Sequence, residues 1–154
     1  MEAIPILLFG QSNADFHLAG PMIVKDEFTD DRIVVLNDGY GHRGRLGQSG
    51  GAPATGFVQA LADQQSNSQR RKAQSIALPT AAALLRHTRT ALSRVIIRSE
   101  AQGSRGLLGH RVGNKIQTGI YQNADGAMAG PFRNLVASTR AAITLARAQG
   151  DRVS

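Results

Sequence analysis

The feature that most constrains this chain is the apolar run at its beginning, residues 4–9, which ends at Gly10. A continuous apolar run bounded by glycine is typical of a β-strand buried on both faces of a parallel sheet. In open α/β sheets the ligand crevice lies just outside the carboxyl ends of the strands. Ser12 follows this strand, so it stands where such a fold presents a nucleophile. Chemistry at Ser12 also requires a base that accepts the hydroxyl proton.

Strand and helix patterns alternate along the rest of the chain. We predict strands at residues 4–10, 33–36 and 95–97, and the start of a further strand within 151–154. Residues 39–54 are rich in glycine and are expected to form a loop. The alternation favours an α/β fold with a central parallel sheet and helices on both of its faces.

Three helices are expected between these strands. The first begins at Thr55, which can cap it, and carries Phe57 and Val58 inward. The second has Pro79 in its first turn, and its apolar spacing runs on to Leu92. The third spans residues 131–149 and is terminated by Gly150.

Composition narrows the chemistry that the chain can perform. The 154 residues suffice for one domain with a core, and 42% of them are hydrophobic. The absence of cysteine excludes disulfides, thiolate metal sites and cysteine catalysis. No zinc or calcium pattern occurs, and the glycines of 39–44 are not followed by the helix that a dinucleotide site requires, so neither a metal nor a cofactor is expected.

The amino terminus and the charge bear on location and partners. The first apolar run is too short to span a bilayer and follows no basic leader, so we expect no membrane partner and a cytoplasmic protein, with a secreted or virion-associated one as the alternative. The formal net charge is +7, with one dense cluster at Arg70-Arg71-Lys72. Arg133, Arg140 and Arg147 recur every seven residues, which predicts a solvated helix face. Aromatic residues make up only 5% of the chain, which does not favour a nucleic-acid partner.

Two segments carry a family resemblance. Gly10-Gln11-Ser12-Asn13 after an apolar strand resembles the first block of SGNH hydrolases, in the branch of sialate O-acetylesterases and acetylxylan esterases. The segment 95–104, which ends in Gln102-Gly103-Ser104, is similar to the second block of the family. The resemblance implies a three-layer, flavodoxin-like SGNH fold and deacetylation of carbohydrates through an acyl-enzyme.

The resemblance also implies roles for individual residues. Ser12 is the expected nucleophile, and the backbone amides of Ser12 and Gly103 are the expected oxyanion donors. The residues expected to support the turn or contact substrate are Gln11, Asn13, Gln102, Ser104 and Arg105, with Arg98 as a further candidate.

The resemblance is incomplete at the carboxyl end. The third block of the family and its later Asp-x-x-His block, which supplies acid and base, match no segment here. None of His17, His42, His87 and His110 stands three residues after an aspartate, and His17 is the nearest to Ser12. We therefore expect residues 1–154 to be the amino-terminal part of a single SGNH-type domain, inactive alone and completed by a carboxyl-terminal part.

Two other function classes stay open from the sequence. One is a non-catalytic carbohydrate-binding or virion-associated module on the same fold. The other is a basic protein associated with nucleic acid through Arg70-Arg71-Lys72.

Overall fold

The computed structural model describes residues 2–10, 28–38, 53–60, 77–88, 92–101, 107–117 and 119–153. The strands and helices in this part are β1 (Glu2–Gly10), β2 (Ile33–Leu36), β3 (Phe57–Gln59), α1 (Ala77–His87), β4 (Leu92–Ala101), β5 (His110–Val112), β6 (Lys115–Gln117), α2 (Gly130–Ala148) and β7 (Arg152–Val153). The α/β class predicted from the sequence is confirmed.

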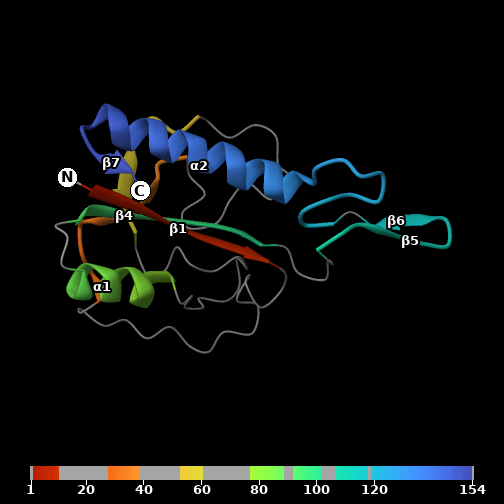
Figure 1. The fold of residues 1–154 in the computed structure, drawn as a ribbon, viewed down its shortest axis with the longest axis horizontal. Coiled ribbons are helices and arrows are strands. Elements are labelled where there is room, and N and C mark those ends of the chain that lie inside the picture. Colours follow the sequence, from red (N-terminus) through yellow and green to blue (C-terminus); the bar gives the residue numbers. More distant parts are fainter. Residues whose placement is uncertain are drawn as a thin grey trace.

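A five-stranded sheet in the order β3-β2-β4-β1-β7 forms the centre of the molecule (Figure 1). Strands β2, β4, β1 and β7 are parallel, whereas β3 pairs with β2 in the antiparallel direction. The four strands β2, β4, β1 and β7 form the parallel sheet that the sequence predicts, and β3 adds an antiparallel strand at one edge, so the whole sheet is mixed. The predicted strand after Gly150 is confirmed, since Arg152 and Val153 pair with Glu2 and Ala3.

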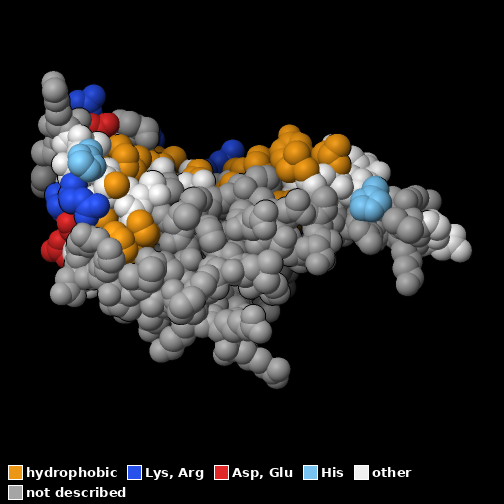
Figure 2. Space-filling view, turned by 90° about the horizontal axis from the view of Figure 1, so that it is seen from below, with side chains coloured by type: hydrophobic (Ala, Val, Ile, Leu, Met, Phe, Trp, Pro, Cys, Tyr) orange, Lys and Arg blue, Asp and Glu red, His pale blue; other side chains and the backbone are white. Residues whose placement is uncertain are grey.

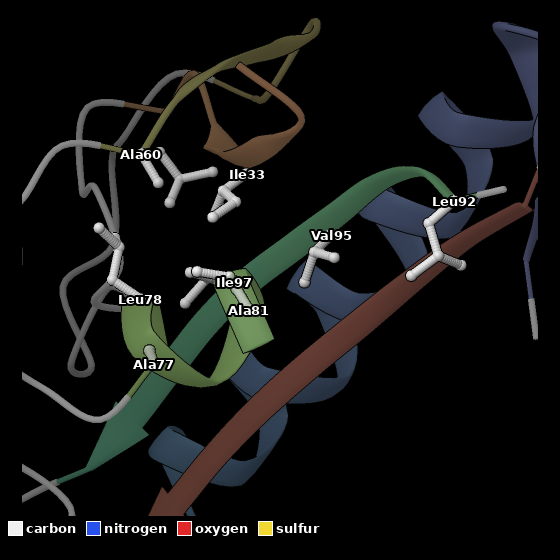
Figure 3. Packing of buried hydrophobic residues seen from close by; sticks show 10 residues of the cluster. Ile33, Ala60, Ala77, Leu78, Ala81, Leu92, Val95 and Ile97 are labelled. Carbon is white, nitrogen blue, oxygen red and sulfur yellow. The ribbon is translucent and has the colours of Figure 1, made fainter. Parts of the chain in front are cut away.

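The two helices cover opposite faces of the sheet (Figure 1). Side chains of a strand alternate between its faces, so Val95 and Ile97 point to one side and Ile96 to the other. Val95 and Ile97 pack with residues of α1, as Figure 3 shows. Ile96 packs with Ala142 and Ala146 of α2. Residues 33–36 of β2 and 95–97 of β4 are thus buried on both sides, which explains why these two segments are continuously apolar.

Helix α2 follows the sequence prediction closely. It begins with Pro131 in its first turn, and Gly150 takes the left-handed conformation, with φ of +85°, just beyond its end. Leu135 and Ala146 are buried on the face toward the sheet. The side chains of the predicted arginine row, Arg133, Arg140 and Arg147, are exposed.

The helix predictions are wrong for residues 57–60, and for Thr88 and Leu92, among the described residues. Phe57–Gln59 is strand β3 rather than part of a helix, because pairing with β2 satisfies its backbone and Ala60 joins the core under α1. The helix that contains Pro79 ends at His87, and Leu92 already belongs to β4. Leu92 packs in the same core as α1, so its apolar character suits either assignment.

Polar contacts hold both ends of the helix-to-strand connection after α2. The Arg94 side chain on β4 is ion-paired with Asp151, at 2.7 Å between Nε and Oδ2, and is hydrogen-bonded to Gln149. Its guanidinium carbon lies 5.0 Å from the centre of the Phe57 ring. Arg94 therefore links the end of α2 to the β3 edge.

A second ion pair lies at the beginning of β2. The Arg32 guanidinium donates to both carboxylate oxygens of Asp30, at 2.9 and 2.7 Å. The Arg32 backbone N–H also donates to this carboxylate. These hydrogen bonds from Arg32 lower the pKa of Asp30, although partial burial acts in the opposite direction.

Residues 107–129 form a small lobe that the sequence analysis does not predict. It contains the antiparallel hairpin β5–β6, which extends away from the sheet in Figure 1. Two segments of the lobe pass close to each other, since a Cβ on Gly119 would lie only 2.5 Å from the backbone nitrogen of Gly109 and 2.8 Å from the carbonyl oxygen of Leu107. The Tyr121 ring packs edge-on against Phe132 of α2, with 4.7 Å between the centroids.

Figure 2 shows one group of hydrophobic side chains toward the end of the molecule that carries the hairpin and another at the opposite end. The large exposed ones of the lobe are Leu107, Leu108, Tyr121 and Met128. Among the described residues, no helix is long and apolar enough to cross a membrane.

Candidate functional site

The site that the sequence predicts lies at the carboxyl ends of β1 and β4. These strands are adjacent and parallel, and their register runs from Ala3 opposite Arg94 to Gly10 opposite Ala101. Both strands therefore end at the same level of the sheet. The chain continues from these paired residues into Gln11 on one side and Gln102 on the other.

The predicted catalytic and substrate residues themselves lie outside the described residues. They are Gln11, Ser12, Asn13, Gln102, Gly103, Ser104 and Arg105. The histidines His17 and His42 and the cluster at residues 70–72 also lie outside the described part.

Arg98 is described, and its position differs from the sequence expectation. Its side chain is only 3% exposed and its Nη2 atom lies 2.9 Å from Oδ2 of Asp38, whose side chain is 4% exposed. A guanidinium buried in this way is an ion-pair partner rather than a substrate contact at the surface. The pair joins β4 to the segment that follows β2.

The residue before Asp38 fixes a second segment at this edge. The Asn37 side-chain oxygen accepts hydrogen bonds from the backbone N–H groups of Thr55 and Gly56, at 2.8 and 3.1 Å. Its Nδ2 donates to the Thr55 hydroxyl at 3.0 Å. Asn37 thereby holds residues 53–56 beside the end of β2.

A pocket of about 240 Å³ lies between these segments and α2. Its polar residues are Asp38, Asn134 and Ser138, and Leu36 and Pro53 are among its apolar ones. Helix α2 leads into β7 at the amino end of β1, so the first half of the helix lies toward the carboxyl edge of the sheet. The pocket is therefore at the same edge as the ends of β1 and β4.

Small residues on α2 leave the space that forms this pocket. Asn134, Ala137, Ser138 and Ala141 lie three or four positions apart and so share one face of the helix. The Asn134 Nδ2 atom is buried and, within the described part of the chain, has no hydrogen-bond partner.

Neither of the described histidines lies at the carboxyl edge of the sheet, where it could act as a base for Ser12. His87 is the last residue of α1 and precedes the start of β4, so it lies toward the amino edge of the sheet, opposite the carboxyl ends of β1 and β4. His110 is exposed on the hairpin strand β5. Among the described residues, no three His, Asp or Glu side chains form a group able to hold a metal ion.

Comparisons with known proteins give no assignment. A scan against protein-family models, a search of the curated proteins and a search of the solved structures each return no match.

The sequence analysis missed Asp38, Asn134 and Ser138 as candidate site residues. A signal for Asp38 was present, because it follows the predicted strand 33–36 just as Ser12 follows the first strand. Asn134 and Ser138 offered no comparable signal, since they sit within an amphipathic helix whose polar positions are expected to face solvent.

Proposed function

We propose that this protein is a carbohydrate O-acetylesterase-like serine hydrolase with an SGNH-type, flavodoxin-like domain. The observation that carries the proposal is the parallel register that ends at Gly10 and Ala101. The two segments that resemble the SGNH blocks leave the sheet from this one pair of neighbouring residues. Ser12 and Gly103 each stand two residues further along the chain, so a common site for the hydroxyl and the amide is within reach.

The proposed reaction has two steps. The Ser12 Oγ attacks the acetyl carbonyl while a histidine accepts the hydroxyl proton, and the sugar leaves as an alcohol after receiving that proton. Water then attacks the acyl-enzyme while the histidine accepts its proton, and the histidine returns this proton to the Ser12 Oγ as the acyl bond breaks and acetate is released. The backbone N–H groups of Ser12 and Gly103 stabilise the negative oxygen of both tetrahedral intermediates.

The base is the part of this mechanism that the 154 residues do not supply in family order. We propose that the Asp-x-x-His block is contributed from outside this chain, by a carboxyl-terminal part of the same domain.

A fluorophosphonate probe tests the proposal directly. The protein, combined with the carboxyl-terminal part proposed above, should be labelled at Ser12, and Ser12→Ala should abolish both the label and acetate release from acetylated xylan. If a protein that includes an Asp-x-x-His block is never labelled by the probe, the non-catalytic carbohydrate-binding module is favoured instead.

A further inference from the structure

The pocket between α2 and the end of β2 has a specific chemical character. Asp38 brings a carboxylate, which accepts hydrogen bonds, and the buried Nδ2 of Asn134 is a donor that lacks an acceptor within the described part of the chain. The Ser138 hydroxyl both donates and accepts. A ligand that matches these groups carries several hydroxyls, because each hydroxyl also donates and accepts.

The charge of the pocket argues for a neutral ligand. The Asp38 carboxylate is ion-paired with Arg98 at 2.9 Å, so the two formal charges compensate each other inside the protein. A carboxylate ligand would bring a second negative charge next to Asp38, which is unfavourable where little water screens it. A cationic ligand would compete with Arg98 for a carboxylate that is already paired.

The volume of the pocket and its apolar lining narrow the class of ligand further. At about 240 Å³ the pocket is smaller than the roughly 300–1,000 Å³ typical of drug-sized ligands. Its apolar residues, Leu36, Pro53, Ala54 and Ala141 among them, offer a surface against which the C–H face of a ring can pack. One sugar ring combines such a face with hydroxyls at its rim.

The position of the pocket relates it to the proposed esterase centre. β2 and β1 are separated in the sheet only by β4, which places them two strand spacings, about 10 Å, apart. Ile33 and Ile4 both lie opposite Val95, so Leu36 is level with Leu7 and β1 continues about 10 Å further to Gly10. The two strand ends are therefore about 14 Å apart. A glycan of two or three units can bridge this distance. We infer that the pocket of Asp38, Asn134 and Ser138 binds one neutral pyranose unit of the substrate. The inference rests on the proposed function for the identity of the bound glycan, but the pocket residues that carry it, Asp38, Asn134 and Ser138, are all described.

Binding of methyl β-D-xylopyranoside, followed by amide chemical shifts in a ¹⁵N-labelled protein, tests this inference. Saturable shifts should appear at Ala54, Asn134 and Ser138, with a Kd on the order of 1 mM. Ala137→Leu, which fills the pocket from α2, should weaken binding at least tenfold. Ala148→Leu makes the same change at an exposed position of the same helix and should leave Kd unchanged.

Two further comparisons separate the components of the inference. Ser138→Ala removes one hydroxyl at little cost in shape and should weaken binding several-fold without loss of folding. The methyl glycoside of N-acetylneuraminic acid, an anion, should bind at least tenfold more weakly than the xyloside. Equal affinity for both glycosides, or equal effects of Ala137→Leu and Ala148→Leu, would overturn the inference.

The experiment also distinguishes failure of the pocket from failure of the esterase proposal. Ser12→Ala should bind the xyloside as the unchanged protein does, because Ser12 is not a pocket residue. Xyloside binding without any fluorophosphonate labelling would retain the pocket and reject the esterase. Labelling at Ser12 without chemical-shift changes on addition of the xyloside would retain the esterase proposal and reject the pocket.

Discussion

Arg98 and Asp38 form a buried ion pair, with 2.9 Å between Nη2 and Oδ2 and both side chains less than 5% exposed. The pair connects the central strand β4 to the segment that follows β2. Removing one member of a buried pair leaves the other charge uncompensated, which typically costs about 3–5 kcal/mol. We expect Arg98→Met to lower the free energy of unfolding by this amount in urea titrations.

Two variants test whether this cost comes from the Asp38 carboxylate, which Arg98→Met leaves buried without its ion-pair partner. Arg98→Met combined with Asp38→Leu should recover part of the loss, because neither charge then remains buried. Arg94→Met removes a 19% exposed arginine from the same strand and face and should cost less. An Arg98 variant no less stable than the Arg94 variant would contradict the prediction.

Gly103 provides the sharpest test of the proposed oxyanion site. Gly103→Pro removes the backbone N–H, and the loss of one such donor should lower kcat about 10²–10³-fold. Gly103→Ala retains the N–H and should keep far more activity. Acetate release by the protein, combined with the carboxyl-terminal part proposed above, is the measurement. Similar kcat values for the two variants would show that this amide is not a donor.

The contribution of Asp30 to the free energy of unfolding should depend on pH, and the direction of its pKa shift gives the sign of that dependence. Its pKa in the folded protein lies below the ordinary value of 3.8, chiefly through the hydrogen bonds from Arg32. The stability from this carboxylate is present above the unfolded-state pKa and is lost as the pH falls through the folded-state pKa. Arg32→Gln should therefore cost about 0.2–1 kcal/mol at pH 7 and less near pH 3.

Carboxyl ¹³C shifts measure this directly. Arg32→Gln should raise the pKa of Asp30 toward its ordinary value, whereas Arg140→Gln, on the exposed face of α2, should leave it unchanged. An Asp30 pKa that is the same in all three proteins would exclude the Arg32 contact as its cause.

Asn37 is expected to stabilise the wall of the pocket. Asn37→Ala removes three hydrogen bonds to Thr55 and Gly56, for a loss of about 1–3 kcal/mol in unfolding free energy. Asn37→Asp keeps an acceptor for both backbone N–H groups and should lose less. Hydrogen exchange at Thr55 and Gly56 should accelerate in the alanine variant only, and equal acceleration in both would argue against this role.

Substitution of Gly150 should lower the stability of the protein although there is room for a larger side chain at this position. Its φ of +85° is unfavourable for residues with a Cβ, and no atom lies within 4 Å of the Cβ that alanine would add. Gly150→Ala should therefore cost about 1–2 kcal/mol through the backbone alone. Gly56→Ala adds a Cβ at ordinary contact distance, 3.7 Å from Asn37, with no positive φ, and should cost less when both are measured by thermal unfolding.

The sequence alone was sufficient wherever the signal is local. Three local signals were interpreted correctly. They are the apolar runs of β1 and β2, the helical spacing that begins at Pro131, and the glycine at position 150 that ends this helix. Each depends only on neighbours within a few positions of the sequence. The rule that places ligands at strand ends indicates the edge of the sheet at which the pocket of Asp38 lies, although the rule was applied to Ser12 and Gly103 and not to Asp38.

Only the tertiary structure decided the features that depend on distant partners. Phe57-Val58 fits a helix or a strand, and pairing with β2 made it β3. The burial of Arg98 depends on Asp38, sixty positions earlier, and the pocket depends on small residues of α2 meeting the end of β2. Such contacts leave no periodic trace in the sequence, because they are made across the sheet and not along the chain.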